Sequence, residues 1–387
     1  MSSPKPTYIY IAFDLFPSQK GAATHINHCL KALQNTFDVG VLICLGNDDM
    51  PAVQFDKERN IFVYRFKEKV VNFLERTTKF KVFVAKIIAL PVCEQIQLVH
   101  FRDIWGGIPV LASSKSFKTV FEVNSFASIE LPSRYPKIPQ NTLHKIAKLE
   151  QQCITESSAI ITPSLITKNY IVSRFNISEA IITHIHNGVE IHPATKNKNV
   201  EKYILYFGAL QKWQGIKTLF KAYKELVDLD LKLIICTSIP EKRVLPYQKL
   251  ATQIGIEKYV EWQYELSKDK LAQVIINAQC TIAPLSACDR NLVQGCNPLK
   301  IIESMAYSVP VIASNLPVCS DIITDNVNGF LVPPDRPEIL GRTIRTLISD
   351  SEKMRVLGNS AKKTIEDSYL WEYQESKMKT IYLQLLN

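Results

Sequence analysis

Residues 281–313 read TIAPLSACDRNLVQGCNPLKIIESMAYSVPVIA. A short apolar run, Thr281–Pro284, precedes a polar loop, and a second apolar run, Val309–Ala313, follows a stretch with helical periodicity. Asn297 suits a helix N-cap and Pro298 suits the first helical position, so we predict that a helix begins there. A strand, a helix and another strand in this order predict a parallel βαβ unit.

The same alternation extends over the whole chain, as two series of apolar runs rich in β-branched residues. The first series is Tyr8–Phe13, Val39–Leu45, Ile61–Phe66, Leu98–Phe101, Thr119–Val123 and Ala159–Thr162. The second series is Tyr203–Phe207, Leu231–Cys236, Val260–Tyr264, Thr281–Pro284, Val309–Ala313 and Phe330–Val332. The predicted fold class is therefore α/β, with two doubly wound Rossmann-like domains.

A run of turn-forming residues at 187–193 and the polar stretch Thr195–Glu201 separate the two series. Such a stretch between two βα series predicts a domain boundary near residue 190. We expect an N-terminal domain at 1–190 and a C-terminal domain at 191–366, which would face each other across a cleft.

Composition excludes several classes of protein. The chain has 387 residues, 46% of them hydrophobic and 21% charged, which is ordinary for a globular protein of two domains and excludes disordered and fibrous chains. No apolar run approaches the roughly 20 residues of a membrane-spanning helix. The nine cysteines are scattered, which argues against a disulfide framework or a zinc site. The N-terminal residues lack the layout of a signal peptide, so we expect a cytoplasmic protein.

The net charge of +9 is spread over both halves without a basic tail, so no nucleic-acid partner is predicted. Residues 66–90 nevertheless form a basic, amphipathic segment. Its cations are Lys67, Lys69, Arg76, Lys79, Lys81 and Lys86. Such a helix can lie on an anionic membrane surface, or it can pack its apolar side into the core and leave its basic side in solvent.

Three strand-to-helix junctions are candidate ligand sites, because ligands of doubly wound sheets bind at the carboxyl ends of strands and helix N-termini attract anions. At the first, Gly21 and Ala22 precede a predicted helix at His25–Leu33 and leave room for a ligand beside the backbone. At the second, Gly208 and Gly215 enclose a loop that carries Lys212. An ordinary βα loop would explain either pattern equally well.

The third junction carries the most chemistry. Lys300, Glu303 and Tyr307 are spaced to share one face of the predicted helix. Near a helix N-terminus, the lysine can bind phosphate while the glutamate binds hydroxyl groups. The alternative is a surface Lys–Glu pair without a ligand.

These residues carry a resemblance. The chain resembles the family 4 glycosyltransferases of GT-B fold, which are retaining enzymes that use nucleotide-activated sugars. The specific stretch is Pro298-x-Lys300-x-x-Glu303 through Ser314, continued by Asn328–Pro334, with weaker similarity in the Gly21 and Gly208 loops. The ending, residues 367–387, is similar to the helix that crosses back to the first domain in these enzymes.

The resemblance implies a hexosyltransferase-type enzyme of polysaccharide or glycoconjugate biosynthesis. Its donor would be a UDP- or GDP-linked sugar, and its acceptor a glycan, a lipid-linked group or a small molecule. The reaction would retain the anomeric configuration and use no cofactor and no metal. Many relatives glycosylate lipid-linked acceptors, so a peripheral position on the cytoplasmic face of a membrane is a further expectation.

The resemblance also suggests roles for individual residues. The expected catalytic residues are Arg290, Lys300 and Asn124. The expected donor-binding residues are Glu303, Gly208, Lys212, Gln294, Gly295, Asn297, Pro298, Leu299, Gly21 and Ala22. The expected acceptor-binding residues are His25 and Glu130.

The sequence departs from the family pattern at several positions. Gly295 stands where the family has a first glutamate, and Ala209 and Gln214 stand where it has two phosphate-binding cations. Asn124 stands where many members have a histidine. A catalytically inactive GT-B relative that acts as a binding or regulatory partner is therefore the alternative. A dinucleotide-dependent oxidoreductase fits poorly, because no strand leads into Gly-x-Gly-x-x-Gly.

Overall fold

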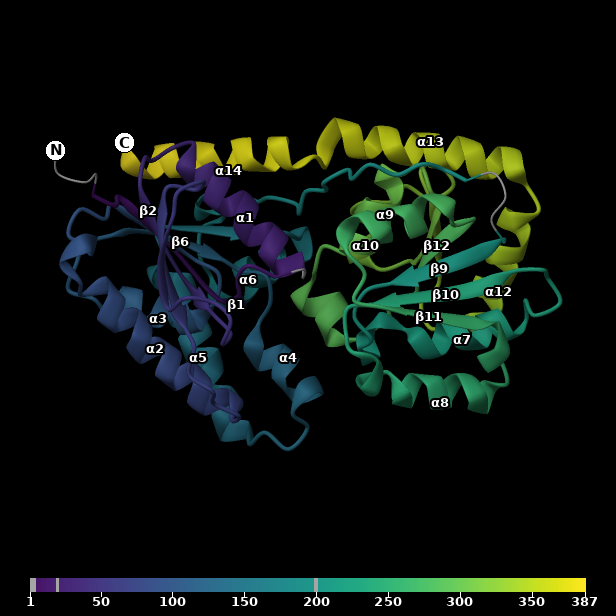
Figure 1. Ribbon diagram of the computed structural model, residues 1–387, viewed down its shortest axis with the longest axis horizontal. Helices are drawn as coiled ribbons and strands as arrows, with labels where there is room; N and C mark the ends of the chain where they lie inside the picture. The colour runs from purple at the N-terminus through teal and green to yellow at the C-terminus, as the bar shows by residue number, and fades with distance from the viewer. Residues whose placement is uncertain (1–4, 19–20, 198–200) are drawn as a thin grey trace. The chain divides into compact units, whose positions relative to one another are not determined.

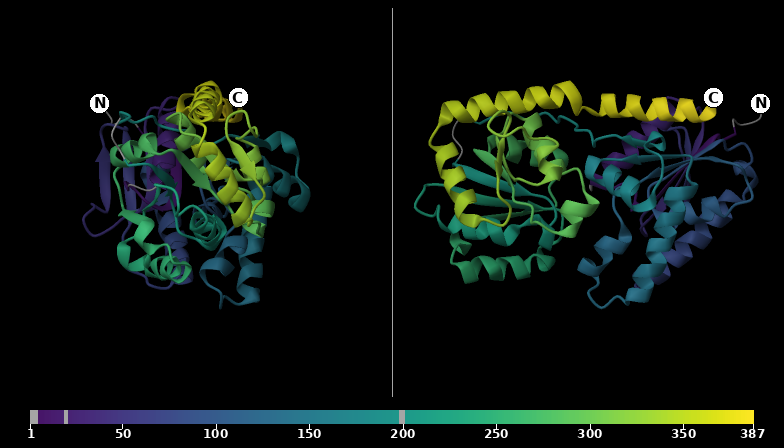
Figure 2. Two further views of the ribbon diagram at one scale, coloured as in Figure 1. Left: turned by 90° about the vertical axis from the view of Figure 1, so that its right-hand side faces the viewer. Right: turned by 180° about the vertical axis from the view of Figure 1, so that it is seen from behind.

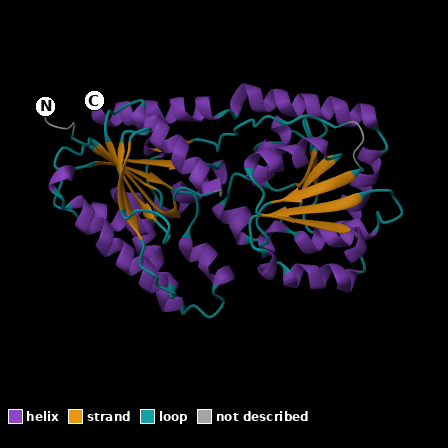
Figure 3. Ribbon diagram, viewed as in Figure 1, coloured by secondary structure: helices purple, strands orange, loops and turns teal. Residues whose placement is uncertain are grey.

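The computed structural model describes residues 5–18, 21–197 and 201–387, which fold as two compact units. Unit 1 comprises Met1–His186 and Glu372–Asn387, and unit 2 comprises Asn187–Trp371. Each unit is a largely parallel sheet with helices on both faces (Figure 1, Figure 3). The predicted α/β class with two Rossmann-like domains is confirmed.

The sheet of unit 1 has the strand order β3-β4-β2-β1-β5-β6-β7-β8, in which only β3 runs antiparallel to its neighbour. The strands are β1 (Tyr8–Leu15), β2 (Gly40–Leu45), β3 (Val53–Asp56), β4 (Ile61–Phe66), β5 (Leu98–Phe101), β6 (Lys118–Glu122), β7 (Ala159–Thr162) and β8 (Ile182–His184). All six runs predicted in this half are strands, and β3 and β8 extend the sheet at its two edges. The strand order reverses between β1 and β5.

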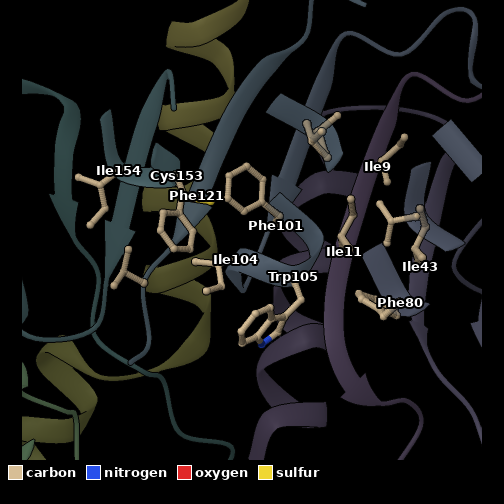
Figure 4. Close-up of a cluster of buried hydrophobic side chains, with 14 of the residues drawn as sticks. Ile9, Ile11, Ile43, Phe80, Phe101, Ile104, Trp105, Phe121, Cys153 and Ile154 are labelled. Carbon is tan, nitrogen blue, oxygen red and sulfur yellow. The ribbon is translucent and has the colours of Figure 1, made fainter. Parts of the chain in front are cut away.

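The two faces of this sheet differ in chemistry. Alternate side chains of β1, such as Ile9 and Ile11, pack with Phe101 and Phe121 against α2 (Phe73–Ile88), α3 (Ile104–Leu111) and α5 (Gln140–Glu156) in an apolar core (Figure 4). The opposite face carries polar side chains and makes contacts with α1 (Gly21–Gln34) and α14 (Trp371–Leu386). The remaining helices are α4 (Ala127–Arg134) and α6 (Leu165–Phe175).

The basic segment at 66–90 is helical only from Phe73 to Ile88, as α2. Phe80, Val84 and Ile88 are buried in the core of unit 1, so the apolar side of α2 packs on the sheet. This agrees with the core-packed alternative for the apolar side and leaves the basic side outward. Among the described residues, no helix is long and apolar enough to cross a membrane.

The sheet of unit 2 is parallel, with the strand order β11-β10-β9-β12-β13-β14. The strands are β9 (Tyr203–Phe207), β10 (Lys232–Thr237), β11 (Val260–Tyr264), β12 (Cys280–Ala283), β13 (Val311–Ser314) and β14 (Phe330–Val332). The helices are α7 (Ile216–Lys224), α8 (Leu245–Ile254), α9 (Lys268–Asn277), α10 (Leu299–Ala306), α11 (Pro317–Ser320), α12 (Pro337–Ile348) and α13 (Ser351–Ser368). This order is typical of doubly wound sheets and reverses between β9 and β12.

Burial on both faces explains why the strands of unit 2 are continuous apolar runs. Ile204 and Tyr206 of β9 face a cluster built with α7, α8 and α12. Leu205 and Phe207, which alternate with them, face a second cluster that includes Ile275 of α9. Within each unit, helices on both faces of the sheet are also visible from the side and from behind (Figure 2).

Candidate functional site

Each unit places its predicted ligand loops where the strand order reverses. In unit 1, the chain that follows β1 enters α1 at Gly21, and β5 ends beside it. In unit 2, the glycine loop follows β9 and the long polar loop follows the neighbouring β12. Crevices at the carboxyl ends of strands at such a switch point are the usual ligand sites of these folds.

The glycine loop and the polar loop of unit 2 form one connected surface. The carbonyl oxygen of Trp213 accepts hydrogen bonds from the Ser286 N–H and the Asn291 side chain, both at 3.0 Å. The guanidinium of Arg290 lies over the Trp213 ring, with Cζ 4.9 Å from its centroid. Arg290 also begins a short π-helical turn that ends at Gln294.

Position 215 has no room for a side chain. Its φ is +71°, and a Cβ there would lie 1.6 Å from the carbonyl oxygen of Pro284, at the end of β12. A glycine is therefore needed where the two loops meet.

Lys300 is a buried cation in the described part of unit 2. It lies in the first turn of α10 with 9% of its surface exposed. Its Nζ donates to Gln214 Oε1 and to the Tyr206 hydroxyl, at 3.3 Å from the latter, and lies 4.4 Å from the centroid of the Tyr206 ring. Burial lowers the pKa of Lys300 to about 7, so the amine loses part of its charge at neutral pH.

Gly208 borders this amine. Its φ is +120°, which L side chains rarely adopt, and a Cβ there would lie 3.5 Å from Cε of Lys300. The glycine thus leaves the backbone next to the buried amine uncovered.

Glu303 follows Lys300 by three residues on α10 and is half-buried. Burial raises the pKa of Glu303 to about 7, against the opposing effect of Lys268 and Lys300. The alternative of a surface Lys–Glu pair is wrong, because Lys300 is buried and donates to neutral oxygens instead.

The predicted start of α10 is one residue early. The helix begins at Leu299, and its N-cap is Pro298, whose ψ of 96° is not helical. Asn297 is buried and is not the N-cap. Since Pro298 has extended backbone while its carbonyl accepts from Ile301 N, the first helical position moves on by one.

The other predicted residues of unit 2 differ in how accessible they are. Lys212 is exposed on a short turn of the glycine loop, and Arg290 and Leu299 are half-buried. Gln294 is fully buried, and Gly295, with φ at +80°, ends the π-helical turn. The structure thus brings Lys300 together with Gly208 and with Gln214, a residue that the sequence identified only as a departure from the family.

Glu122, the last residue of β6, is the centre of the site in unit 1. Its carboxylate is buried and surrounded by five nitrogen or hydroxyl groups. These are Arg102 Nη1 at 2.6 Å, the Tyr10 hydroxyl at 3.0 Å, His25 Nδ1 at 3.3 Å, His100 Nε2 at 3.4 Å and the side-chain amide of Asn124. A buried charge with this many partners is satisfied within the unit.

The electrostatics of this cluster favour a neutral His25 beside a charged Glu122. Burial lowers the pKa of His25 to about 4, although Glu122 alone would raise it. Burial would also raise the pKa of Glu122, but the charge of Arg102 and the hydrogen bond with His100 help to outweigh burial and hold that pKa well below its usual value. Glu122 is therefore ionised at neutral pH and pairs with Arg102.

The buried side of helix α14 contacts the same cluster. The Tyr382 hydroxyl lies 2.9 Å from His100 Nδ1. Two turns earlier on α14, Glu375 lies 2.6 Å from His28 Nδ1 and 3.2 Å from Lys31 Nζ, both on α1. The C-terminal helix thus fixes α1 and β5 of unit 1.

Of the residues predicted for unit 1, His25 and Asn124 meet at Glu122, and Gly21 and Ala22 form the first turn of α1, which begins earlier than predicted. Glu130 is half-buried on α4. Sequence reasoning missed Glu122 and Arg102, although charged residues directly at the end of apolar strands were a signal that could have identified them.

Within the described part of unit 1, one group of three side chains has the donors that metal ions prefer. His25, Cys29 and Glu122 place one ligand atom each within 4.8 Å of one another, but Arg102 and Tyr10 already occupy the two carboxylate oxygens. The chain also has an Asp-x-Asp pair, Asp228 and Asp230, just before β10 at the amino ends of the strands. Both oxygens of Asp228 bind Arg345 at 2.7 Å.

Comparisons with known proteins identify the family of both halves of the chain. The family model "Glycosyl transferases group 1" matches residues 189–364, and the model "Glycosyltransferase Family 4" matches residues 19–192. A glycosyltransferase of Methanocaldococcus jannaschii, itself named as uncharacterized, is 24% identical over 380 residues, with 94% of each chain covered.

Two solved structures are similar over nearly the whole chain. Sucrose-phosphate synthase from Thermosynechococcus elongatus has a TM-score of 0.82 at 17% identity and covers 99% of both chains. HepE from Anabaena, solved in complex with UDP and glucose, has a TM-score of 0.74 at 14% identity, covering 98% of this chain and 100% of that one. At such identities the likeness establishes the fold.

The contact at Gly215 predicts a position-specific loss of stability. Gly215→Ala should lower the free energy of unfolding by about 3 kcal/mol or more, because positive-φ strain adds to a clash with the Pro284 carbonyl. Gly255→Ala is the matched control, since its φ is +83° but no atom lies within 4 Å, and should cost only about 1 kcal/mol. Urea unfolding of both variants measures the difference, and equal losses would contradict the packing described.

Proposed function

The chain belongs to the glycosyltransferases of GT-B fold, and we propose that it transfers a hexose from a UDP- or GDP-linked donor, with retention of configuration, to a hydroxyl group of a glycan, a lipid-linked group or a small molecule. The transfer would serve the synthesis of a polysaccharide or glycoconjugate. No cofactor other than the nucleotide-sugar co-substrate takes part in this proposal.

The observation that carries the proposal is the buried amine of Lys300. It donates only to neutral oxygens in its two hydrogen bonds, at the switch point of the unit 2 sheet. A buried cation without a hydrogen-bonded carboxylate gains most from an anionic ligand. A diphosphate would supply that charge, and the N-terminus of α10 would add backbone N–H groups.

Different residues of unit 2 would bind different parts of the nucleotide. Arg290 and Lys212 would contact the diphosphate together with Lys300, beside the exposed backbone at Gly208. Glu303, one turn into α10, would accept hydrogen bonds from the ribose hydroxyls. In unit 1, the first turn of α1 at Gly21 offers further backbone N–H groups.

In the proposed step, the bond between the anomeric carbon and the diphosphate oxygen breaks. The acceptor oxygen bonds to the anomeric carbon on the same face of the sugar, and its proton passes to the departing diphosphate oxygen. Lys300 and Arg290 would stabilise the charge on the leaving group, so we propose that no divalent metal is required. His25, Asn124 and Glu130 of unit 1 would bind the acceptor.

Nucleotide binding tests the donor site. We expect UDP or GDP to bind with micromolar affinity in calorimetry without metal. Glu303→Ala should weaken binding about tenfold to hundredfold, because a hydrogen bond to a charged group contributes about 1.5–3 kcal/mol. Lys300→Met should weaken it at least as much.

Glu338→Ala, which removes an exposed glutamate of α12, is the matched control and should bind as the wild type does. ADP serves as a third ligand. A folded protein that binds no nucleotide would refute the transferase and support the alternative of an inactive relative.

The ionisation of Lys300 and Glu303 predicts a bell-shaped pH dependence of nucleotide affinity. Below pH 7 Glu303 becomes protonated and can no longer accept from two hydroxyls, whereas above pH 7 Lys300 loses its charge. Affinity should therefore peak near pH 7 and fall by up to about tenfold per pH unit on either side. In Glu303→Gln the loss on the acid side should shrink to what the titrating phosphate itself causes, and an unchanged profile would contradict the assignment.

We also propose that the basic side of α2 binds an anionic membrane surface. With Phe80 and Val84 in the core, this contact would be electrostatic. The protein should co-sediment with phosphatidylserine vesicles at low salt and dissociate at about 0.5 M salt, where charges are screened.

Lys81→Glu/Lys86→Glu should weaken this binding more than tenfold. Lys362→Glu/Lys363→Glu is the control. It changes the net charge by the same amount, but on α13, and should have little effect. Equal effects of the two double variants, or no co-sedimentation at low salt, would refute a membrane contact through α2.

A further inference from the structure

Glu122 and Asn124 are neighbours at the carboxyl end of β6. Glu122 is the last residue of the strand and is buried, whereas Asn124, two residues later, is half-buried. The side-chain amide of Asn124 donates to the same carboxylate oxygen that receives Arg102 Nη1. One oxygen of Glu122 therefore binds both the guanidinium and the amide.

The chemistry of this contact fixes the orientation of Asn124. An ionised carboxylate only accepts hydrogen bonds, and an asparagine side chain has an NH₂ donor on one side and a carbonyl acceptor on the other. Because Arg102 keeps Glu122 ionised, the NH₂ group must face Glu122. The carbonyl oxygen of Asn124 is then the end of the amide that does not face this carboxylate.

Glu122 itself has little freedom to move. The Tyr10 hydroxyl donates to its second oxygen, and His100, which is held by Tyr382 of α14, lies 3.4 Å from the same oxygen. Three secondary-structure elements of unit 1, β1, α1 and β5, and the loops that follow β5 and β6 thus place partners around one carboxylate. A side chain held in this way can orient its neighbour precisely enough for binding.

We infer that Glu122 is a positioning residue, which fixes Asn124 so that its carbonyl oxygen accepts a hydrogen bond from a sugar hydroxyl at the carboxyl edge of the unit 1 sheet. This inference rests on the proposed function and adds a residue that acts through another. A fixed acceptor oxygen selects a ligand with a hydroxyl donor and disfavours a phosphate oxygen, which offers only acceptors. The hydroxyl can belong to the acceptor or to the donor sugar.

A double-mutant cycle tests this inference. Turnover is measured with the sugar donor whose nucleotide binds in calorimetry, once with water as acceptor and once with octyl glycosides of glucose, mannose and galactose. Asn124→Ala and Glu122→Gln should each lower kcat more than tenfold while the Kd of the nucleoside diphosphate stays within twofold. Because Glu122 acts through Asn124, the double variant should be no slower than Asn124→Ala.

The two reactions distinguish the source of the hydroxyl. Loss of transfer to the glycosides alone assigns it to the acceptor, and equal loss of hydrolysis assigns it to the donor sugar. Glu338→Gln, which removes one negative charge from the exposed side of α12, is the control and should leave turnover unchanged.

Several results would overturn the inference. The inference fails if Asn124→Ala turns over as fast as the wild type. It also fails if the double variant is slower than Asn124→Ala by the full factor that Glu122→Gln causes alone. If Glu122→Gln does not fold, Asn124→Asp replaces it, because an ionised aspartate cannot donate to Glu122 and should be as slow as Asn124→Ala. Failure of the wild type to bind any nucleotide would instead refute the proposed function.

Discussion

One buried carboxylate organises the functional edge of unit 1. Glu122 receives hydrogen bonds or close cationic contacts from side chains of β1, α1 and the ends of β5 and β6, and α14 contributes through Tyr382 and His100. Removing one partner of such a buried pair typically costs about 3–5 kcal/mol, because the other charge remains buried without compensation. The side chains that contact Glu122 therefore depend on that one charge for their positions.

Unit 2 buries a charge of the opposite sign, on Lys300, whose hydrogen-bond partners are uncharged. Glu122 has a cationic partner, whereas Lys300 donates to the neutral oxygens of Gln214 and Tyr206. Glu122 is thus suited to holding neighbouring side chains in place. The shift in the pKa of Lys300 to about 7 is the cost of this burial, and an anionic ligand would reverse it. This difference separates the positioning role inferred for Glu122 from the anion-binding role proposed for Lys300.

The fold was largely predictable because strands buried on both faces are continuous apolar runs that alternate with amphipathic helices. The edge strand β3, with exposed Val53 and Phe55, lacks that signal. The importance of Lys300 and Glu303 followed from their spacing, but the burial of Lys300 did not, since it depends on Tyr206 of another strand. Likewise, Glu122 becomes central only through Arg102 and His100 of β5 and its adjoining loop, and sequence spacing does not reveal such contacts.

We propose that the switch point of unit 2 binds the diphosphate of a nucleotide sugar through Lys300. A crystal structure of the protein with its preferred nucleoside diphosphate tests this most directly. We expect a phosphate oxygen within hydrogen-bond distance of Lys300 Nζ, beside Gly208, and a ribose hydroxyl bound to Glu303. A nucleotide bound elsewhere, with Lys300 still donating only to Gln214 and Tyr206, would contradict the account.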